Sequence, residues 1–133
     1  MKICLIRYQK LIALLIFSAL MQISCGGGDA NVPSTIHTVS ISWNPNRETA
    51  VNTTGGGYKV YYSTSSGFSI SDAGVSMVDV PFVAPPAAPT TTSLQLATGR
   101  YNFRVVAYSA LTPHGGSGGS TSTPSNQIAL TVP

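Results

Sequence analysis

The sequence LQLATGRYNFRVVAYS, residues 94–109, contains the pattern that decides the fold. From Arg100 onward the side chains alternate in character, as they do in a β-strand, where successive residues point to opposite faces. One set of alternate residues is apolar, and we expect it to face the core: Tyr101, Phe103, Val105 and Ala107. The other set would face away from the core: Asn102, Arg104, Val106 and Tyr108. The stretch therefore predicts a central strand.

Five further stretches have the composition of short strands and are separated by turn-rich segments. They are residues 36–44, 58–63, 75–83, 91–96 and 128–132. Pro81 lies in the third of them and predicts an edge strand, because proline has no N–H to donate to a neighbouring strand. No helical periodicity follows residue 24, so we expect an all-β sandwich of six to seven strands.

The same alternation predicts which other side chains are buried. In residues 36–44, Val39, Ile41 and Trp43 alternate with small polar residues, which is typical of a half-buried strand. The inward positions of the neighbouring stretches are again apolar or aromatic: Tyr58, Val60, Tyr62, Leu94, Leu96, Ile128, Leu130 and Val132. We expect Trp43 and Tyr101 to be large members of the core.

The first 24 residues have the layout of an export signal and not of a domain element. A basic start is followed by an apolar run of eleven residues, Leu11–Met21, whereas a membrane-spanning helix needs about 20. The small residue Ser24 precedes Cys25, and MQISCGGG resembles the cleavage site of a bacterial lipoprotein signal. We expect a signal helix and a lipid on Cys25. Plain secretory cleavage nearby is the alternative.

The positive charge of the chain belongs to this signal. The formal net charge is +3, and Lys2, Arg7 and Lys10 account for all of it. Beyond residue 24, four basic residues balance four acidic ones. No basic stripe is left to bind phosphates, so we expect no nucleic-acid partner.

Residues that could carry catalysis are few and scattered. His37 and His114 have no pattern linking them, and Asp72 and Asp79 lack the further oxygen ligands that a hard cation needs. One cysteine, Cys4, lies in the signal and the other is the proposed lipid site, so no thiolate site or disulfide remains. We expect no enzyme, no metal and no cofactor.

One group of exposed residues is a candidate binding patch. Tyr61 and Tyr108 point away from the core on strands that we expect to be neighbours, and Lys59 and Arg104 lie beside them. Exposed Tyr and Arg are enriched in binding hot spots. The alternative is ordinary cross-strand pairing of residues that suit a pleated surface.

Several motifs together resemble a fibronectin type III domain of the kind found in bacterial exported proteins. They are VSISW followed by Asn-Pro, GGYKVYYSTSSG, and LATGRYNFRVVAY followed by PSNQIALTV. The resemblance implies an immunoglobulin-like sandwich, and the Leu–Gly–Tyr sequence before the central strand resembles a tyrosine corner. We therefore expect a signal peptide in residues 1–24, a lipidated cysteine with a flexible tether in residues 25–35, and the domain in residues 36–133.

The resemblance implies a binding or spacer module, because such domains mostly serve as interaction or linking units. We expect a monomer, anchored to a membrane of the bacterial cell envelope through Cys25 and facing a protein ligand. In a Gram-negative cell this would be the outer membrane. A carbohydrate-binding module that uses Tyr61 and Tyr108 as a stacking platform is the alternative.

Two long glycine-rich loops, residues 44–57 and 111–125, bear on how such a module would be oriented. Hairpin connections usually have about two to five residues, so these loops exceed simple connectors. Too few residues separate Cys25 from Ile36 for both a tether and a complete strand. If no strand precedes Ile36, both loops would project away from the membrane. The alternative is that they are ordinary surface loops.

Overall fold

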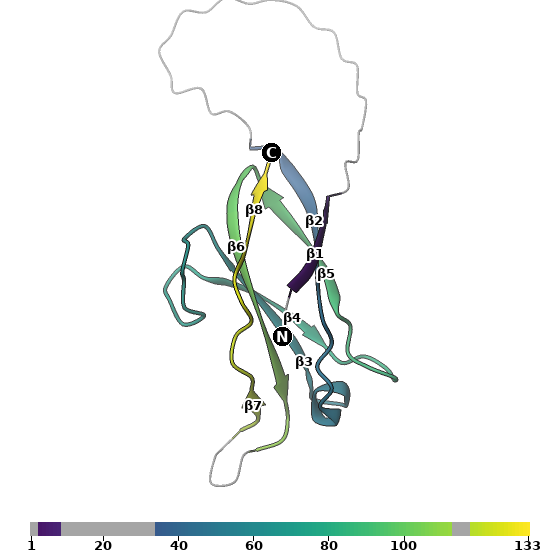
Figure 1. The fold of residues 1–133 in the computed structure, drawn as a ribbon. Helices are drawn as coiled ribbons and strands as arrows, with labels where there is room; N and C mark the ends of the chain where they lie inside the picture. The colour runs from purple at the N-terminus through teal and green to yellow at the C-terminus, as the bar shows by residue number, and fades with distance from the viewer. Residues whose placement is uncertain (1–2, 9–33, 113–117) are drawn as a thin grey trace, which may run out of the picture.

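Figure 1 shows the computed structural model of the chain, which describes residues 3–8, 34–112 and 118–133. This part contains strands and one short 3₁₀-helix, η1 (Thr49–Asn52), and it has no helix that is long and apolar enough to cross a membrane. The strands are β1 (Ile3–Tyr8), β2 (Ile36–Trp43), β3 (Gly57–Ser63), β4 (Ser76–Pro81), β5 (Thr91–Ala97), β6 (Gly99–Ser109), β7 (Ser120–Thr121) and β8 (Ile128–Val132). All six strands expected from the sequence are present.

The strands form two antiparallel sheets. The first sheet has the order β1-β2-β5, and the second has the order β4-β3-β6-β7, with β8 also paired to β6. In the first sheet Val39 pairs with Leu94, and in the second Val60 pairs with Val105. β4 lies at an edge, as Pro81 predicted, and β6 is the central strand of its sheet.

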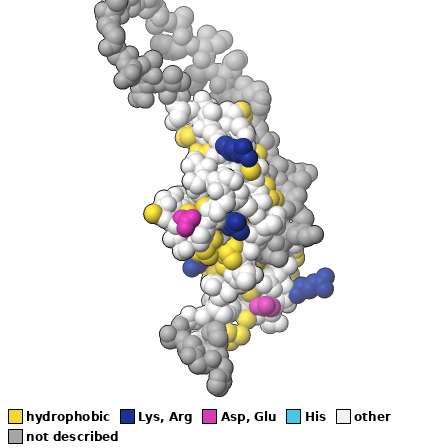
Figure 2. Space-filling view, turned by 60° about the vertical axis from the view of Figure 1, so that its left-hand side comes forward, with side chains coloured by type: hydrophobic (Ala, Val, Ile, Leu, Met, Phe, Trp, Pro, Cys, Tyr) yellow, Lys and Arg dark blue, Asp and Glu magenta, His cyan; other side chains and the backbone are white. Residues whose placement is uncertain are grey.

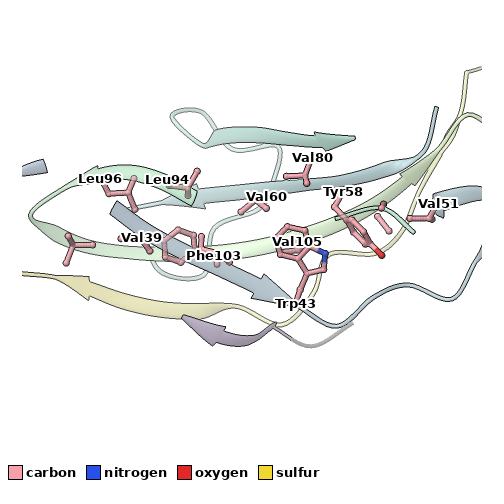
Figure 3. Packing of buried hydrophobic residues seen from close by; sticks show 14 residues of the cluster. Val39, Trp43, Val51, Tyr58, Val60, Val80, Leu94, Leu96, Phe103 and Val105 are labelled. Atoms are coloured by element: carbon pink, nitrogen blue, oxygen red, sulfur yellow. The ribbon is translucent and has the colours of Figure 1, made fainter. Parts of the chain in front are cut away.

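The core lies between these two sheets, as the close view in Figure 3 shows. Val39, Ile41 and Trp43 of β2 pack from one sheet against Tyr58 and Phe103 of the other, and all five are buried. Trp43 meets Tyr58 edge to face, with 5.3 Å between ring centroids. Apolar side chains with period two on both inner faces thus make the sandwich, as the alternation predicted.

Tyr101 differs from its prediction. Its side chain is only partly buried, where it packs against the rim of the core beside Tyr62 and Phe103. Within the described residues its hydroxyl makes no hydrogen bond, so the expected tyrosine corner is not formed there. The phenol that bonds to backbone is that of Tyr58, whose oxygen accepts the N–H of Asn46 at 2.6 Å.

Two residues expected to face outward, Asn102 and Val106, are buried. The Asn102 side-chain amide donates to the carbonyl of Thr64 at 3.3 Å, and its oxygen accepts from Gln127 at 3.1 Å. The outer face of β6 is therefore covered in part by the segments on either side of it. Alternation along a strand predicts which face a side chain takes, but not whether that face is covered.

The first described segment is a strand, which contradicts the helix expected for this part of the signal. β1 pairs antiparallel with β2, with Ile6 opposite Ile41 and Tyr8 opposite Val39. Isoleucine and tyrosine favour extended structure, and β2 offers an unpaired edge to such a segment. The premise that no strand precedes Ile36 is thus wrong for the full chain. Residues 9–24 of the expected helix lie outside the described residues.

Candidate binding surfaces

The four residues of the predicted patch lie together on the outer face of the second sheet. Tyr61 of β3 pairs directly with Arg104 of β6, and Gly57 pairs with Tyr108. Lys59 lies between these two pairs on the same side of β3. All four patch side chains are half-buried. The structure therefore brings the predicted residues side by side but leaves them only partly accessible.

Contacts within the sheet occupy much of Tyr108. The Lys59 ammonium lies over its ring, with Nζ 5.2 Å from the ring centroid. The Asp79 carboxylate of β4 lies near its hydroxyl. Partial burial raises the pKa of Tyr108 to about 12, and the neighbouring Asp79 carboxylate adds to the shift. A ring covered on one side by an ammonium has less surface left for stacking against a ligand.

Arg104 is likewise engaged with its own chain. Its guanidinium lies 5.7 Å from the ring centroid of Phe68, and its Nη1 donates to the carbonyl of Ser125 at 3.3 Å. Phe68 is buried, although it belongs to the loop that joins β3 to β4. This loop therefore folds over the outer face of β6. Figure 2 shows the region as hydrophobic side chains mixed with basic and acidic ones about halfway along the molecule.

A second surface is made by three loops at one pole of the sandwich: residues 44–56, residues 82–90, and the described parts of the third loop, residues 110–112 and 118–119. Asn52 ties the first two together, because its oxygen accepts the N–H of Ala88 at 3.0 Å. A second tie is the N–H of Phe82, which donates to the carbonyl of Gly56 at 2.8 Å. In Figure 1 this pole is the lower end of the molecule, where η1 and β7 lie.

The glycines of the first loop are needed for this packing. A side chain at Gly56 would place its Cβ 2.4 Å from the carbonyl oxygen of Ala50, which no structure tolerates without a shift. At Gly55, with φ of +84°, a Cβ would come 2.7 Å from that of Ala110 in the third loop. The first and third loops are thus in close contact, and the first is an ordered element and not a slack connector.

The loop pole carries a shallow recess and exposed apolar side chains. The recess has a volume of about 240 Å³ and is lined mostly by polar residues, namely Glu48, Val51, Ala107, Tyr108, Ser109, Ser120, Thr121 and Ser122. Val83 of the second loop is 78% exposed and Leu111 of the third is 65% exposed. Protein-contacting surfaces combine apolar and polar area, and the loop pole presents both.

The remaining candidate residues form no further site in the described part of the chain. The Asp72 carboxylate accepts the N–H of Ser69 at 2.7 Å within its own turn. His37 lies on β2, whereas His114 and Cys25 lie outside the described residues. Among the residues that the structure describes, no group of three or more His, Cys, Asp or Glu side chains could hold a metal ion.

Two serines that the sequence analysis did not single out complete the central strand. The Ser125 hydroxyl accepts the N–H of Val105 at 2.9 Å, and the Ser122 hydroxyl accepts that of Ala107 at 3.0 Å. They lie in the second half of the segment that was expected to be a long loop, and residues 120–125 in fact run along β6. No pattern in the sequence predicts these two hydrogen bonds, because a bond from a side chain to distant backbone depends on the path by which the chain folds back along β6.

Comparisons with protein-family models, with curated proteins and with solved structures found no match for this chain. The fold by itself defines the class of protein as an all-β sandwich of two antiparallel sheets.

Proposed function

We propose that the chain is an exported lipoprotein with a single domain of the fibronectin type III type, which mediates protein–protein interaction at the bacterial cell envelope. The order of strands supports the domain type. β2 and β5 belong to one sheet and β3, β4, β6 and β8 to the other, so the chain crosses between sheets as in immunoglobulin-like sandwiches.

The observation that carries the proposal is the position of the two poles. The carbonyl of Thr35, just before β2, accepts the N–H of Thr98 at 3.1 Å, and the Thr98 hydroxyl donates to the carbonyl of Pro133 at 2.7 Å. The start of β2 and the chain end thus share the upper pole in Figure 1, opposite the three loops.

A lipid on Cys25 would attach near this upper pole. Cleavage before Cys25 would remove β1, and the ten residues from Gly26 to Thr35 would then connect the anchor to the domain. A flexible chain of this length spans about 17 Å. The loop pole, with the exposed side chains of Val83 and Leu111, would then face away from the membrane as the contact surface.

Cell fractionation tests the anchor. The wild-type chain, expressed in a bacterial host, should appear in the membrane fraction with a mass increased by the lipid. Cys25→Ala should yield a soluble or uncleaved product, because the acyl acceptor is missing. Unchanged partitioning of the Cys25→Ala variant into detergent would falsify the lipoprotein assignment.

Site-specific crosslinking in intact cells tests the contact surface. A photoreactive residue at Val83 or Leu111 should crosslink to a protein, whereas one at Gln95, on the exposed face of β5, should not. Crosslinks from Gln95 alone would place the contact elsewhere.

The carbohydrate alternative has less support from the geometry, because Lys59 covers the ring of Tyr108 and Asp79 lies near its hydroxyl. It stays a prediction. A glycan array probed with the domain and with its Tyr61→Ala variant would test it.

A further inference from the structure

The proposed function assigns no role to one edge of β2, the edge that pairs with β1. β1 pairs with β2 from Val39 to Trp43. β2 has β5 as its neighbour on the other side. If export removes residues 1–24, β2 becomes the edge of its sheet.

The backbone groups that face this edge follow from the bonds on the opposite side. The N–H of Trp43 donates to the carbonyl of Thr90 at 3.0 Å, and the carbonyl of Thr35 accepts from Thr98, so both residues bond toward β5. Backbone groups of successive residues in a strand point in opposite directions. The N–H and C=O groups of Thr38 and Ser40 therefore point away from β5, toward the position of β1.

The β2 edge lacks the features that protect edge strands. Its eight residues, IHTVSISW, contain no lysine, no acidic residue and no proline. The edge strand of the other sheet, β4, has Asp79 and Pro81. Charges and prolines discourage the addition of a further strand, and their absence leaves a long, regular edge open to pairing.

The register of β1 shows which sequence suits this edge. Ile3, Ile6 and Tyr8 lie opposite the three buried residues of β2, which are Trp43, Ile41 and Val39. Leu5 and Arg7 lie opposite Ser42 and Ser40. Residues opposite one another in antiparallel strands share a face of the sheet. An added strand therefore matches β2 when the residues that come opposite Trp43, Ile41 and Val39 are apolar or aromatic; β1 places such residues there across a register shift between Ile3 and Leu5.

We infer that the β2 edge of the processed protein is a strand-accepting site for an extended segment of a partner protein. The segment adds antiparallel to β2, in the register of β1, with apolar residues opposite Trp43, Ile41 and Val39. Backbone hydrogen bonds supply affinity in this mode, and the alternate side chains supply selectivity. The inference rests on the proposed function, because cleavage before Cys25 is what removes β1.

The anchor favours a partner segment over a second copy of this chain. Two β2 strands paired antiparallel would have their Ile36 ends at opposite ends of the pair. Eight residues of strand span about 26 Å, and each tether spans about 17 Å. If one copy stands with the start of its β2 at the membrane, as proposed above, the start of β2 in its antiparallel partner would lie about 26 Å from the membrane, which is farther than the tether spans. A segment of another protein has no such constraint.

A peptide with the sequence of residues 2–9 serves as the probe. It is titrated, under reducing conditions, into a chain of residues 26–133 and into the processed protein extracted from membranes in detergent. The described core cluster lies wholly between Val39 and Val132, so the shortened chain keeps all of it. Cooperative thermal unfolding of the shortened chain is recorded first.

Amide resonances of β2 report where the peptide binds. We expect saturable shifts and slowed hydrogen exchange at Ser40, which lies within the span that pairs with β1 in the full chain, while the outer edge of β5 is unchanged. Ser40→Pro removes an edge donor and should weaken binding by about tenfold or more. Ser40→Ala is the matched control. It loses only the hydroxyl contact with Ser93, so its affinity should stay within about twofold.

Three outcomes would overturn the inference: no binding to a folded shortened chain, shifts confined to β5, or equal binding by the proline and alanine variants. A concentration-dependent dimer whose exchange protection at β2 needs no peptide would assign the edge to a second copy instead. Because the shortened chain needs no processing, these results are independent of the Cys25→Ala experiment. If the signal is never cleaved from the chain in cells, the proposed function is refuted. The affinity of the peptide for the β2 edge of the shortened chain would remain a valid measurement.

Discussion

At the scale of single residues, Tyr58 links the core to the loop pole. Its ring is fully buried against Trp43, and its oxygen lies at the mouth of the first loop, where it accepts the N–H of Asn46. Burial raises the pKa of Tyr58, while the bond from Asn46 opposes the shift. A tyrosine can serve both roles because its body is apolar and its tip is polar.

Truncation of Trp43 tests the core. Trp43→Ala should reduce the free energy of unfolding by about 3–5 kcal/mol, because it removes a buried indole and its edge contact with Tyr58. Denaturant unfolding measures the change. Ser93→Ala, on the exposed face of β5, should change stability by no more than about 0.5 kcal/mol. A Trp43→Ala midpoint close to that of the wild type would show that the indole is not part of the core.

Tyr108 makes stability depend on pH in the alkaline range. The ordinary pKa of a tyrosine is 10.0, and in the folded protein that of Tyr108 is raised to about 12. Between these two pH values the folded state binds more protons than the unfolded state. The contribution of Tyr108 to the free energy of unfolding is therefore fully present below pH 10 and is lost as the pH rises toward 12.

The Tyr108→Phe variant isolates this dependence. It should lose stability less steeply over the same pH range, with a remaining slope from Tyr58, whose pKa is also raised. Phenolate absorbance of the folded wild type should show a late-titrating tyrosine that is absent from the variant. Identical slopes for the two proteins would show that the pKa of Tyr108 is not raised in the folded protein.

At the scale of elements, the central strand β6 is completed by a segment that is not a strand. β7 pairs with the end of β6 and β8 with its beginning, while between them Ser122 and Ser125 bond to it through their hydroxyls. Pro124 lies between these serines and has no N–H to contribute. Side-chain hydroxyls thus continue the pairing where a regular ladder is interrupted.

Removal of one hydroxyl tests this arrangement. Ser125→Ala should cost about 1–3 kcal/mol, because it leaves the buried N–H of Val105 without an acceptor. Thermal or denaturant unfolding measures the loss, and hydrogen exchange at Val105 should accelerate. Thr123→Ala, two residues before Ser125 and exposed, is the control and should be nearly neutral. Equal stability of both variants would show that another group, such as water, satisfies Val105.

At the scale of the whole molecule, the two poles differ in what they present. The upper pole gathers the start of β2 and the chain end, and the lower pole gathers three loops that are tied to one another (Figure 1). Because the sandwich between the two poles is rigid, the distance between them is fixed. An anchor at one pole would therefore determine what the other pole can reach.

Labelling of introduced cysteines tests this orientation. In cells, a cysteine in place of Leu111 should react faster with a bulky maleimide than one in place of Thr98, if the anchor holds the Thr98 pole near the membrane. In a Cys25→Ala product that has been released from the membrane the difference should shrink, because neither pole is then held near a membrane. Faster labelling at Thr98 in the anchored protein would reverse the orientation.

The sequence by itself was sufficient to predict the six main strands, the edge position of β4 and the facing of Val39, Ile41, Trp43 and Val105. These features depend on local alternation and on proline, which act within a few residues. It also predicted that Lys59, Tyr61, Arg104 and Tyr108 lie together, because neighbouring strands in register carry their outward residues side by side.

Only the tertiary structure decided what covers each face and which phenol reaches backbone. Asn102 and Val106 are buried because other segments return over β6. Tyr58 takes the backbone bond expected of Tyr101 because the first loop folds back onto it. The strand made by Ile3–Tyr8 likewise depends on an unpaired edge far along the chain. Contacts of this kind join distant residues, and no local periodicity encodes them.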